Sequence, residues 1–230
     1  MAYLLPLERL DAAASGDLRG KRVADFGHGG IGRLRLFAEM GAEAVGIDVD
    51  TVQPVLYAAP GDQGPFGKVG GSVKLVHGRF PADPKVVAAV GGDYDLFLSK
   101  NTLRRGYIHP AEKVDPRMLV NLGVDDSTFL KAVASALKPG GWLVIYNLSP
   151  APNAAGKPYL PWADGRCPFS AQDLVAAGFE TIIRDSVDDQ AARALGAALG
   201  WDKPPVGMKL ADDLFALVTI ARKKPLAGRD

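Results

Sequence analysis

Residues 21–50 read KRVADFGHGGIGRLRLFAEMGAEAVGIDVD, and this stretch decides the fold that the sequence predicts. It begins with a short apolar run, Val23 to Phe26, which predicts a strand. Glycines at positions 27, 29, 30 and 32 come next, and glycine lets a backbone turn sharply and approach a ligand without a clash from Cβ. Apolar residues at i, i+3 and i+4 spacings then predict a helix that stops at Gly41. A strand, a glycine turn and a helix in this order indicate half of a nucleotide-cofactor site.

A second strand, predicted over Ala44 to Ile47, ends at Asp48. An acid at the tip of this strand can accept hydrogen bonds from the hydroxyls of a ribose. Its separation from the first glycine of the turn, 48 − 27 = 21 residues, fits the offset of about 20 residues in dinucleotide-binding folds. The cofactor contacts expected from this unit are Asp25, Gly27, His28, Gly29, Asp48 and Val49.

Two cofactor classes compete for this unit. The spacing Gly27-x-Gly29-x-x-Gly32 satisfies the fingerprint of nicotinamide dinucleotide sites. Asp25 favours the other class, because the first strand of a dinucleotide fold runs apolar into the turn, whereas here an acid stands two residues before the first glycine. In this feature the chain resembles the class I S-adenosylmethionine-dependent methyltransferases, whose first motif is an acid, one residue and then Gly-x-Gly-x-Gly. Asp25, Gly27 and Gly29 are in register with that motif, and Ile31 stands where the third glycine is expected.

The resemblance gives Asp25 two roles, which are to orient the glycine turn or to accept a hydrogen bond from the ammonium group of the cofactor. An alternative needs no ligand, since an acid at a strand end can cap the next helix. His28 lies inside the turn, where it packs against the cofactor or serves as a base.

A second resemblance lies at Leu137–Gly141, which reads LKPGG. Proline stops the preceding helix, predicted over 126–137, and the glycines let the chain reverse into a strand over 142–147. This order is typical of class I methyltransferases and unusual in NAD-dependent dehydrogenases. The resemblance covers about residues 21–223 and implies a doubly wound α/β sheet of about seven mostly parallel strands, with the last strand antiparallel. Further strands are predicted at 72–77, 94–99, 180–184 and 214–221, and an exposed loop at 60–71.

Composition narrows the class of protein. A chain of 230 residues with 47% hydrophobic residues can bury a full core, and we expect a lead-in over 1–20 and one domain over 21–230. The net charge of +1 gives no electrostatic case for nucleic acid or an anionic membrane as a partner. Cys167 is the one cysteine, the histidines are scattered, and no long apolar run is present, so we expect no metal site, no disulfide, no membrane span and a cytoplasmic location.

The remaining cofactor contacts follow from the resemblance and from the position of ligands beyond the carboxyl ends of parallel strands. After the strand at 72–77 the family often has an acid that meets the adenine amino group. Arg79 stands there instead, and both Arg79 and Phe80 are expected to contact the cofactor. Phe80 would hold adenine through its backbone amide or by stacking of its ring, with a buried phenylalanine of no ligand role as the alternative. Ser99 and Lys100 end the next strand, and Lys100 is expected to meet the methionyl carboxylate or a substrate acid unless it is an ordinary solvated lysine.

These observations predict an S-adenosylmethionine-dependent methyltransferase that acts on a small-molecule acceptor, reached through the loops at 102–125 and 148–168. Methyl transfer is an in-line displacement, so the main tasks of the protein are to hold the acceptor close and to exclude water. If a proton must leave the acceptor, His109 and then Tyr107 are the candidate bases. The alternatives are an NAD(P)-dependent oxidoreductase and a non-catalytic cofactor-binding module of the same fold.

Overall fold

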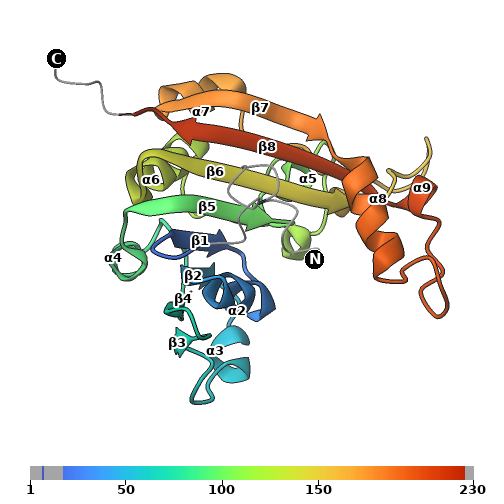
Figure 1. Cartoon of the computed structure of the whole chain (residues 1–230). Helices are drawn as coiled ribbons and strands as arrows, with labels where there is room; N and C mark the ends of the chain where they lie inside the picture. The colour runs from blue at the N-terminus through green and yellow to red at the C-terminus, as the bar shows by residue number, and fades with distance from the viewer. Residues whose placement is uncertain (1–6, 8–17, 226–230) are drawn as a thin grey trace.

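The computed structural model describes residue 7 and residues 18–225 of the chain. Within them, eight strands join into one sheet in the order β3-β4-β2-β1-β5-β6-β8-β7 (Figure 1). The strands are β1 (Arg22–Phe26), β2 (Glu43–Asp48), β3 (Gly64–Phe66), β4 (Gly71–His77), β5 (Tyr94–Lys100), β6 (Leu137–Ser149), β7 (Phe179–Val187) and β8 (Phe215–Lys223).

The directions of the strands confirm the predicted doubly wound sheet. Strands β4, β2, β1, β5 and β6 are parallel, and β8 is antiparallel to both of its neighbours, β6 and β7. All seven predicted strands form. The loop predicted at 60–71 is wrong in part, because β3 lies within it and pairs antiparallel with β4 at the sheet edge. The side-chain carbonyl of Gln63 accepts a hydrogen bond from Leu75 N at 2.8 Å, so tertiary contact orders a segment whose glycine and proline content predicts a loop.

Helices cover both faces of the sheet. Two hydrophobic clusters form, one between the sheet and α4, α6 and α7, and the other between the sheet and α2 and α8. Helix N-termini at Asp83, Asp125 and Ser170 are capped by side chains that accept backbone N–H groups. The helices are α2 (Gly32–Glu39), α3 (Gln53–Leu56), α4 (Pro84–Val90), α5 (Arg105–Ile108), α6 (Asp126–Ala136), α7 (Ala171–Ala176), α8 (Asp189–Ala198) and α9 (Leu210–Asp213), with 3-10 turns at Pro116–Met118 and Pro161–Ala163.

The LKPGG segment differs from its predicted role as a connection. Helix α6 ends at Ala136, and β6 begins at once at Leu137, which pairs with Tyr94 of β5. The glycines keep their predicted use inside the strand, since Gly140 has a φ of +77° and lets the chain bend before regular pairing resumes at Trp142. Beyond β2 the chain forms one helical turn, α3, over Gln53–Leu56.

The predicted lead-in at 1–20 falls mainly outside the described residues, and the domain boundary stays a prediction. Leu7, which is described, is buried in the cluster on the α2 and α8 face. None of the helices within the described part of the chain has the length and apolar character that crossing a membrane requires.

The approach of β4 to α2 gives a test of the packing. A Cβ on Gly71 would lie 1.9 Å from the carbonyl oxygen of Ala38, a backbone atom that cannot move aside cheaply. We expect Gly71→Ala to lower the free energy of unfolding by about 2–4 kcal/mol in urea titrations. Gly32→Ala is the matched control, because a Cβ on Gly32 at the start of α2 meets no heavy atom within 4 Å. Its effect should stay within about 1 kcal/mol, and equal losses for both variants would contradict the packing described.

Candidate functional site

A cavity of about 420 Å³ opens at the carboxyl ends of β1, β2 and β4. Six of the residues predicted to contact a cofactor line this cavity together with Thr102 and the segment 119–122, which belongs to the long connection between β5 and α6. We call this space the nucleotide cavity. The six predicted residues are Gly27, Gly29, Asp48, Val49, Arg79 and Phe80.

The glycine turn needs its glycines for two different reasons. Gly27 has a φ of +68°, and a Cβ there would lie 2.2 Å from Oγ1 of Thr102, whose hydroxyl donates to the carbonyl of Gly27 at 3.2 Å. Gly29 has a φ of +59°, and a Cβ there would meet no heavy atom within 4 Å. Gly27 therefore lets the β5 connection pack against the turn, and Gly29 leaves open space beside the cavity.

Asp48 sits at the end of β2 as predicted, and the backbone fixes its carboxylate. The amide of Gly29 donates to Oδ2 at 3.0 Å, and the amide of Asp50 donates to Oδ1 at 2.9 Å. Each carboxylate oxygen keeps a second lone pair, and Asp48 lines the nucleotide cavity. The carboxylate is thus preorganised to accept hydroxyl groups from a ligand.

A buried ion pair lies beneath the turn. The Asp25 side chain is 0% exposed and that of Arg33 in α2 is 4% exposed, and Nε and Nη2 of Arg33 donate to the two carboxylate oxygens at 2.5 Å each. Burial raises the pKa of Asp25, while Arg33, His28 and Lys100 act in the opposite direction. The ion pair therefore ties β1 to the start of α2 next to the glycine turn, and the two roles predicted for Asp25 toward the turn and the cofactor stay predictions.

His28 is buried and does not line the nucleotide cavity. Its ring packs close to Gly46, where a Cβ would lie 2.8 Å from Cδ2 of the imidazole. Burial lowers the pKa of His28, so the ring is neutral at pH 7. It borders a smaller neighbouring space of about 220 Å³ that shares Asp48 with the nucleotide cavity.

Phe80 and Arg79 form the side of the cavity where adenine was expected. The Phe80 ring is 2% exposed and packs on Phe97 and Phe129, with ring centroids 5.9 Å and 6.3 Å away. The ring is therefore buried in the core and also borders the cavity, and its contact with adenine stays a prediction. Arg79 is exposed, and its Cδ lies 2.6 Å from the position of a Cβ on Gly123, so its side chain runs along the β5–α6 connection.

Ser99 and Lys100 lie at the end of β5 but do not line the nucleotide cavity. The Ser99 hydroxyl is buried and accepts from Leu103 N at 3.1 Å, so it holds the turn that follows the strand. Lys100 lies close enough to the Asp25–Arg33 pair to interact with it electrostatically. Burial lowers the pKa of Lys100 to about 8, with Arg33 acting in the same direction and Asp25 against it.

Arg104 and Asn147 hold the two predicted acceptor loops together. Arg104 is 3% exposed and donates to the carbonyls of Asn101, Leu148 and Trp162, so it is not available for a substrate acid. Asn147 donates to the carbonyls of Leu103 and Gly165, each at 2.9 Å. Because each side chain spans both loops, the ends of β5 and β6 form one rigid rim.

The candidate bases lie beside an outer recess of about 650 Å³. His109 is half exposed, and its Nε2 is 2.7 Å from Oδ2 of Asp126 at the start of α6. The guanidinium carbon of Arg104 lies over the ring of Tyr107, 4.9 Å from the centroid of that ring. Residues 119–122 line both this recess and the nucleotide cavity, so they form the wall between the two spaces.

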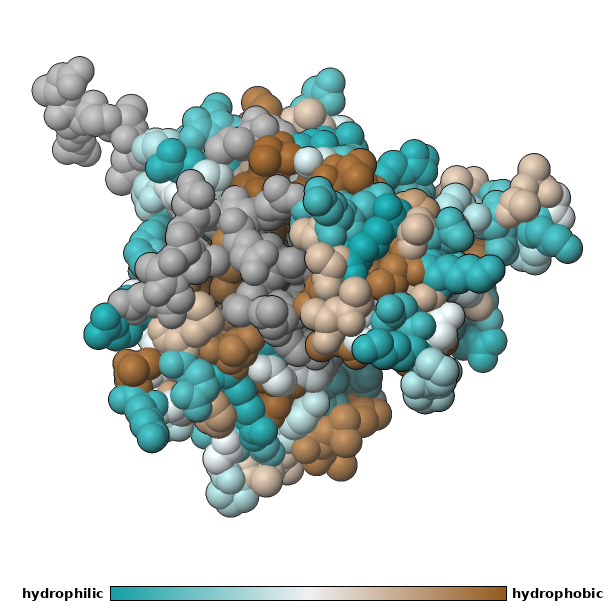
Figure 2. All heavy atoms as spheres, turned by 45° about the vertical axis from the view of Figure 1, so that its right-hand side comes forward, coloured by the Kyte–Doolittle hydropathy of each residue, from teal (hydrophilic) through white to brown (hydrophobic). Residues whose placement is uncertain are grey.

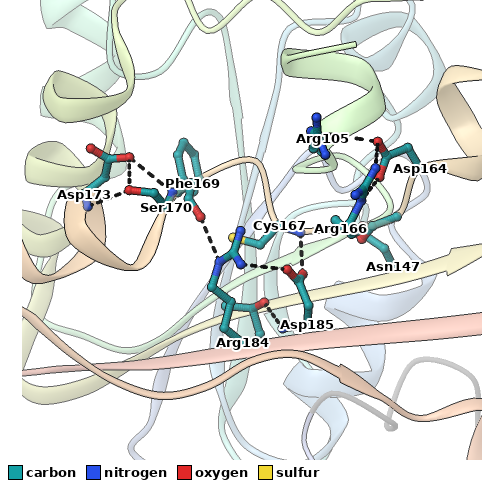
Figure 3. Close-up of polar contacts among 12 residues, drawn as sticks. Arg105, Asn147, Asp164, Arg166, Cys167, Phe169, Ser170, Asp173, Arg184 and Asp185 are labelled. Carbon is teal, nitrogen blue, oxygen red and sulfur yellow. Dashed lines mark hydrogen bonds and ion pairs between the residues drawn. The ribbon is translucent and has the colours of Figure 1, made fainter. Parts of the chain in front are cut away.

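Figure 3 shows a second polar group, in which the connection between β6 and α7 meets α5. Arg166 donates through Nε and Nη2 to the two oxygens of Asp164, both at 2.7 Å, and Nε of Arg105 lies 4.0 Å from the same carboxylate. Burial acts to raise the pKa of Asp164, but Arg166 and Arg105 hold it below its usual range. Cys167 is buried, and burial raises its pKa to about 11, which keeps it a protonated thiol at neutral pH.

Sequence reasoning missed Arg33, Thr102 and the wall 119–122. Arg33 lies on the buried side of α2 together with Leu34, Phe37 and Ala38, and an arginine among apolar residues carries no signal in the sequence that it pairs with Asp25. No sequence pattern predicts the wall 119–122, because its position depends on how the long irregular β5–α6 connection packs against the nucleotide cavity. Among the described residues no group of histidine, cysteine and acid side chains could hold a metal ion.

No protein-family model matches the sequence, and no curated protein matches it. Solved structures do match over nearly the whole chain. A proposed sarcosine dimethylglycine methyltransferase from Galdieria sulphuraria is 13% identical with a TM-score of 0.53, covering 97% of this chain and 85% of that one. An S-adenosylmethionine-dependent methyltransferase from Mesorhizobium loti is 18% identical with a TM-score of 0.52, and the match covers 96% of this chain and 97% of that one. The [4+2]-cyclase SpnF is 18% identical with a TM-score of 0.50, and the match covers 96% of this chain and 81% of that one.

The chain therefore has the class I methyltransferase fold. The sheet order supports this independently, because the antiparallel β8 is inserted between β6 and β7, whereas the dinucleotide-binding fold continues with parallel strands in the order 3-2-1-4-5-6. The NAD-type alternative is not favoured by this topology.

The Asp25–Arg33 pair predicts a pH-dependent loss of stability. We expect Arg33→Met to lower the free energy of unfolding by about 3–5 kcal/mol at pH 7.5, since it leaves a carboxylate buried without a partner. Burial raises the folded-state pKa of Asp25 above its unfolded value, so the penalty falls as the pH drops towards that unfolded value. Urea titrations at pH 7.5 and pH 5 measure the difference. In the double variant Asp25→Asn/Arg33→Met the loss should be smaller and nearly independent of pH, and a pH-independent loss in Arg33→Met would rule the account out.

Proposed function

We propose that this protein is an S-adenosylmethionine-dependent methyltransferase that modifies a small molecule. The observation that carries the proposal is the nucleotide cavity, where the glycine turn and Asp48 meet the segment after β4 and the start of the β5–α6 connection. The methyltransferase fold of the chain and the acid at Asp25 support the same class of cofactor.

The residues of the cavity fit the nucleoside part of this cofactor. A volume of about 420 Å³ is within the range of small-molecule sites, and Gly29 adds no side chain to it. Asp48 offers a fixed carboxylate to a ribose diol, and Phe26, Ile47 and Phe80 supply apolar walls for a base. Bound there, the cofactor would supply an electrophilic methyl group.

In the proposed reaction, the residues of the chain hold the cofactor and the acceptor in place and enclose them from water. The Asp25–Arg33 pair fixes the turn beneath the cofactor, and Arg104 with Asn147 fixes the rim beyond β5 and β6. A rigid rim keeps an acceptor close to the donor and excludes water, which is the main requirement of an in-line displacement.

A small acceptor is favoured over a nucleic acid by charge and by surface character. The net charge of the whole sequence is +1. Figure 2 turns the carboxyl-end side of the sheet towards the viewer, and its coloured surface is a mosaic of hydrophilic and hydrophobic side chains. A cytoplasmic location, expected from the sequence, is part of the same proposal.

A non-catalytic or differently catalytic protein is the second candidate. The cyclase SpnF shares the fold, so the fold alone does not fix the reaction. Incubation with S-adenosylmethionine labelled in its methyl group, with cell extract as the source of acceptor, separates the two. A labelled small-molecule product supports the methyltransferase. Label in nucleic acid would show that the acceptor is a nucleic acid instead of a small molecule. Binding of S-adenosylmethionine without label in any fraction favours the second candidate.

The ribose contact is tested by titration calorimetry with S-adenosylhomocysteine. We expect the wild-type protein to bind it and Asp48→Asn to weaken binding by roughly 10- to 150-fold, because one charged acceptor of the ribose hydroxyls is lost. Asp50→Asn is the matched control, since Asp50 is exposed and caps Val52 N at 2.9 Å without lining the cavity. Tight binding of NADH with none of the thioether would overturn the proposal.

His109 and Tyr107 remain the proposed bases, and the contact with Asp126 sharpens their test. Asp126 engages Nε2 of His109, which leaves Nδ1 to take a proton. We expect His109→Ala to lower turnover by roughly a hundredfold with the affinity for S-adenosylhomocysteine unchanged, and Asp126→Asn to lower it less. Unchanged turnover in His109→Ala would remove this residue from the mechanism.

A further inference from the structure

A second cavity, which we call the loop cavity, lies under the connection that follows β6. It has a volume of about 480 Å³ and is separate from the nucleotide cavity, with no lining residue in common. Its walls come from residues 152–166, from Glu112 of the β5–α6 connection and from Leu217 of β8. No step in the binding of a nucleoside accounts for it.

The two cavities flank the same short piece of chain. The nucleotide cavity reaches Thr102, and the loop cavity reaches Asp164 and Arg166. Arg105 N donates to the carbonyl of Arg166 at 2.7 Å, so the loop cavity borders a point three residues beyond Thr102. Three residues span at most about 10 Å, so the walls of the two cavities lie close together along this piece of chain.

The lining carries charges of both signs. Glu112 and Lys157 are exposed and form no ion pair with any described residue. The Asp164 carboxylate is already neutralised by Arg166, whose side chain remains 51% exposed, and Arg105 adds a further positive charge nearby (Figure 3). With that pair neutralised, the lining offers a positive charge at Lys157, the exposed side of the Arg166 guanidinium and a negative charge at Glu112.

A polar group in the lining also lacks a partner. The hydroxyl oxygen of Tyr159 is buried and makes no hydrogen bond to the described part of the chain. A buried hydroxyl without a partner loses free energy unless a ligand or water satisfies it. Its neighbourhood is cationic, because Tyr159 and Arg166 are close enough to interact electrostatically. A carboxylate accepts hydrogen bonds from a hydroxyl, an ammonium and a guanidinium at once.

We propose that the loop cavity is the acceptor site and that it takes a small zwitterion of the amino-acid type. Its carboxylate would meet Arg166, Lys157 and the Tyr159 hydroxyl, and its ammonium group would meet Glu112. This assignment rests on the proposed function, since it names the substrate class of that reaction. A simple anion fits less well because it would leave Glu112 without a counter-charge, and a simple amine would leave the cationic side empty.

The test is titration calorimetry on the full chain, with and without saturating S-adenosylhomocysteine. The probes are the twenty standard L-amino acids, followed, for the tightest binder, by its decarboxylated amine and its deaminated acid. We expect at least one amino acid to bind, and both truncated analogues to bind at least tenfold more weakly. Lys157→Ala, Glu112→Gln and Tyr159→Phe should each weaken binding of the amino acid about three- to tenfold while leaving the affinity for S-adenosylhomocysteine unchanged.

Lys113→Ala and Asp202→Asn are the matched controls, because both residues are exposed and neither lines the loop cavity. The proposal is overturned if no amino acid binds, if either truncated analogue binds as tightly as the zwitterion, or if the lining variants behave like the controls. Failure of S-adenosylhomocysteine to bind the wild-type protein would defeat the proposed function instead. Titration of the amino acids without it still tests the loop cavity in that case.

Discussion

The buried pair of Asp25 and Arg33 is the interaction on which the site depends. It joins the end of β1 to α2 under the glycine turn, with two hydrogen bonds of 2.5 Å between fully or nearly fully buried groups. Two charges in the interior are tolerable only when each satisfies the other. The direction in which the turn faces, and hence the place of Gly27 and Gly29 beside the nucleotide cavity, follows from this constraint.

A second constraint acts on the loops beyond β5 and β6. The guanidinium of Arg104 donates hydrogen bonds to three backbone carbonyls, and the side-chain amide of Asn147 donates to two more. Loops that are far apart in the sequence therefore share one hydrogen-bond network. Such a network keeps long irregular loops in one conformation, because breaking it would leave buried polar groups unpaired. The nucleotide cavity and the loop cavity are consequently held at fixed positions on either side of Thr102–Arg105.

The fold leaves the reaction open while the cavities narrow it. Solved structures with the same fold include methyltransferases and a cyclase. In this chain the fold carries a fixed carboxylate at Asp48, Arg79 and Phe80 after β4, and a charged cavity beside the rim. Because the fold alone does not fix the reaction, specificity has to come from side chains such as these.

The sequence by itself determined the parallel sheet, its glycine turn and the acid at Asp48, because each depends on local rules: apolar runs form strands, glycine permits the turn, and an acid at a strand tip faces a ligand. It also predicted six residues of the nucleotide cavity. Only the tertiary structure decided the partner of Asp25, the use of Arg104 and Ser99 inside the protein, and the position of the wall 119–122. Those features depend on which distant groups meet when the chain closes, and residue type and spacing along the chain do not contain that information.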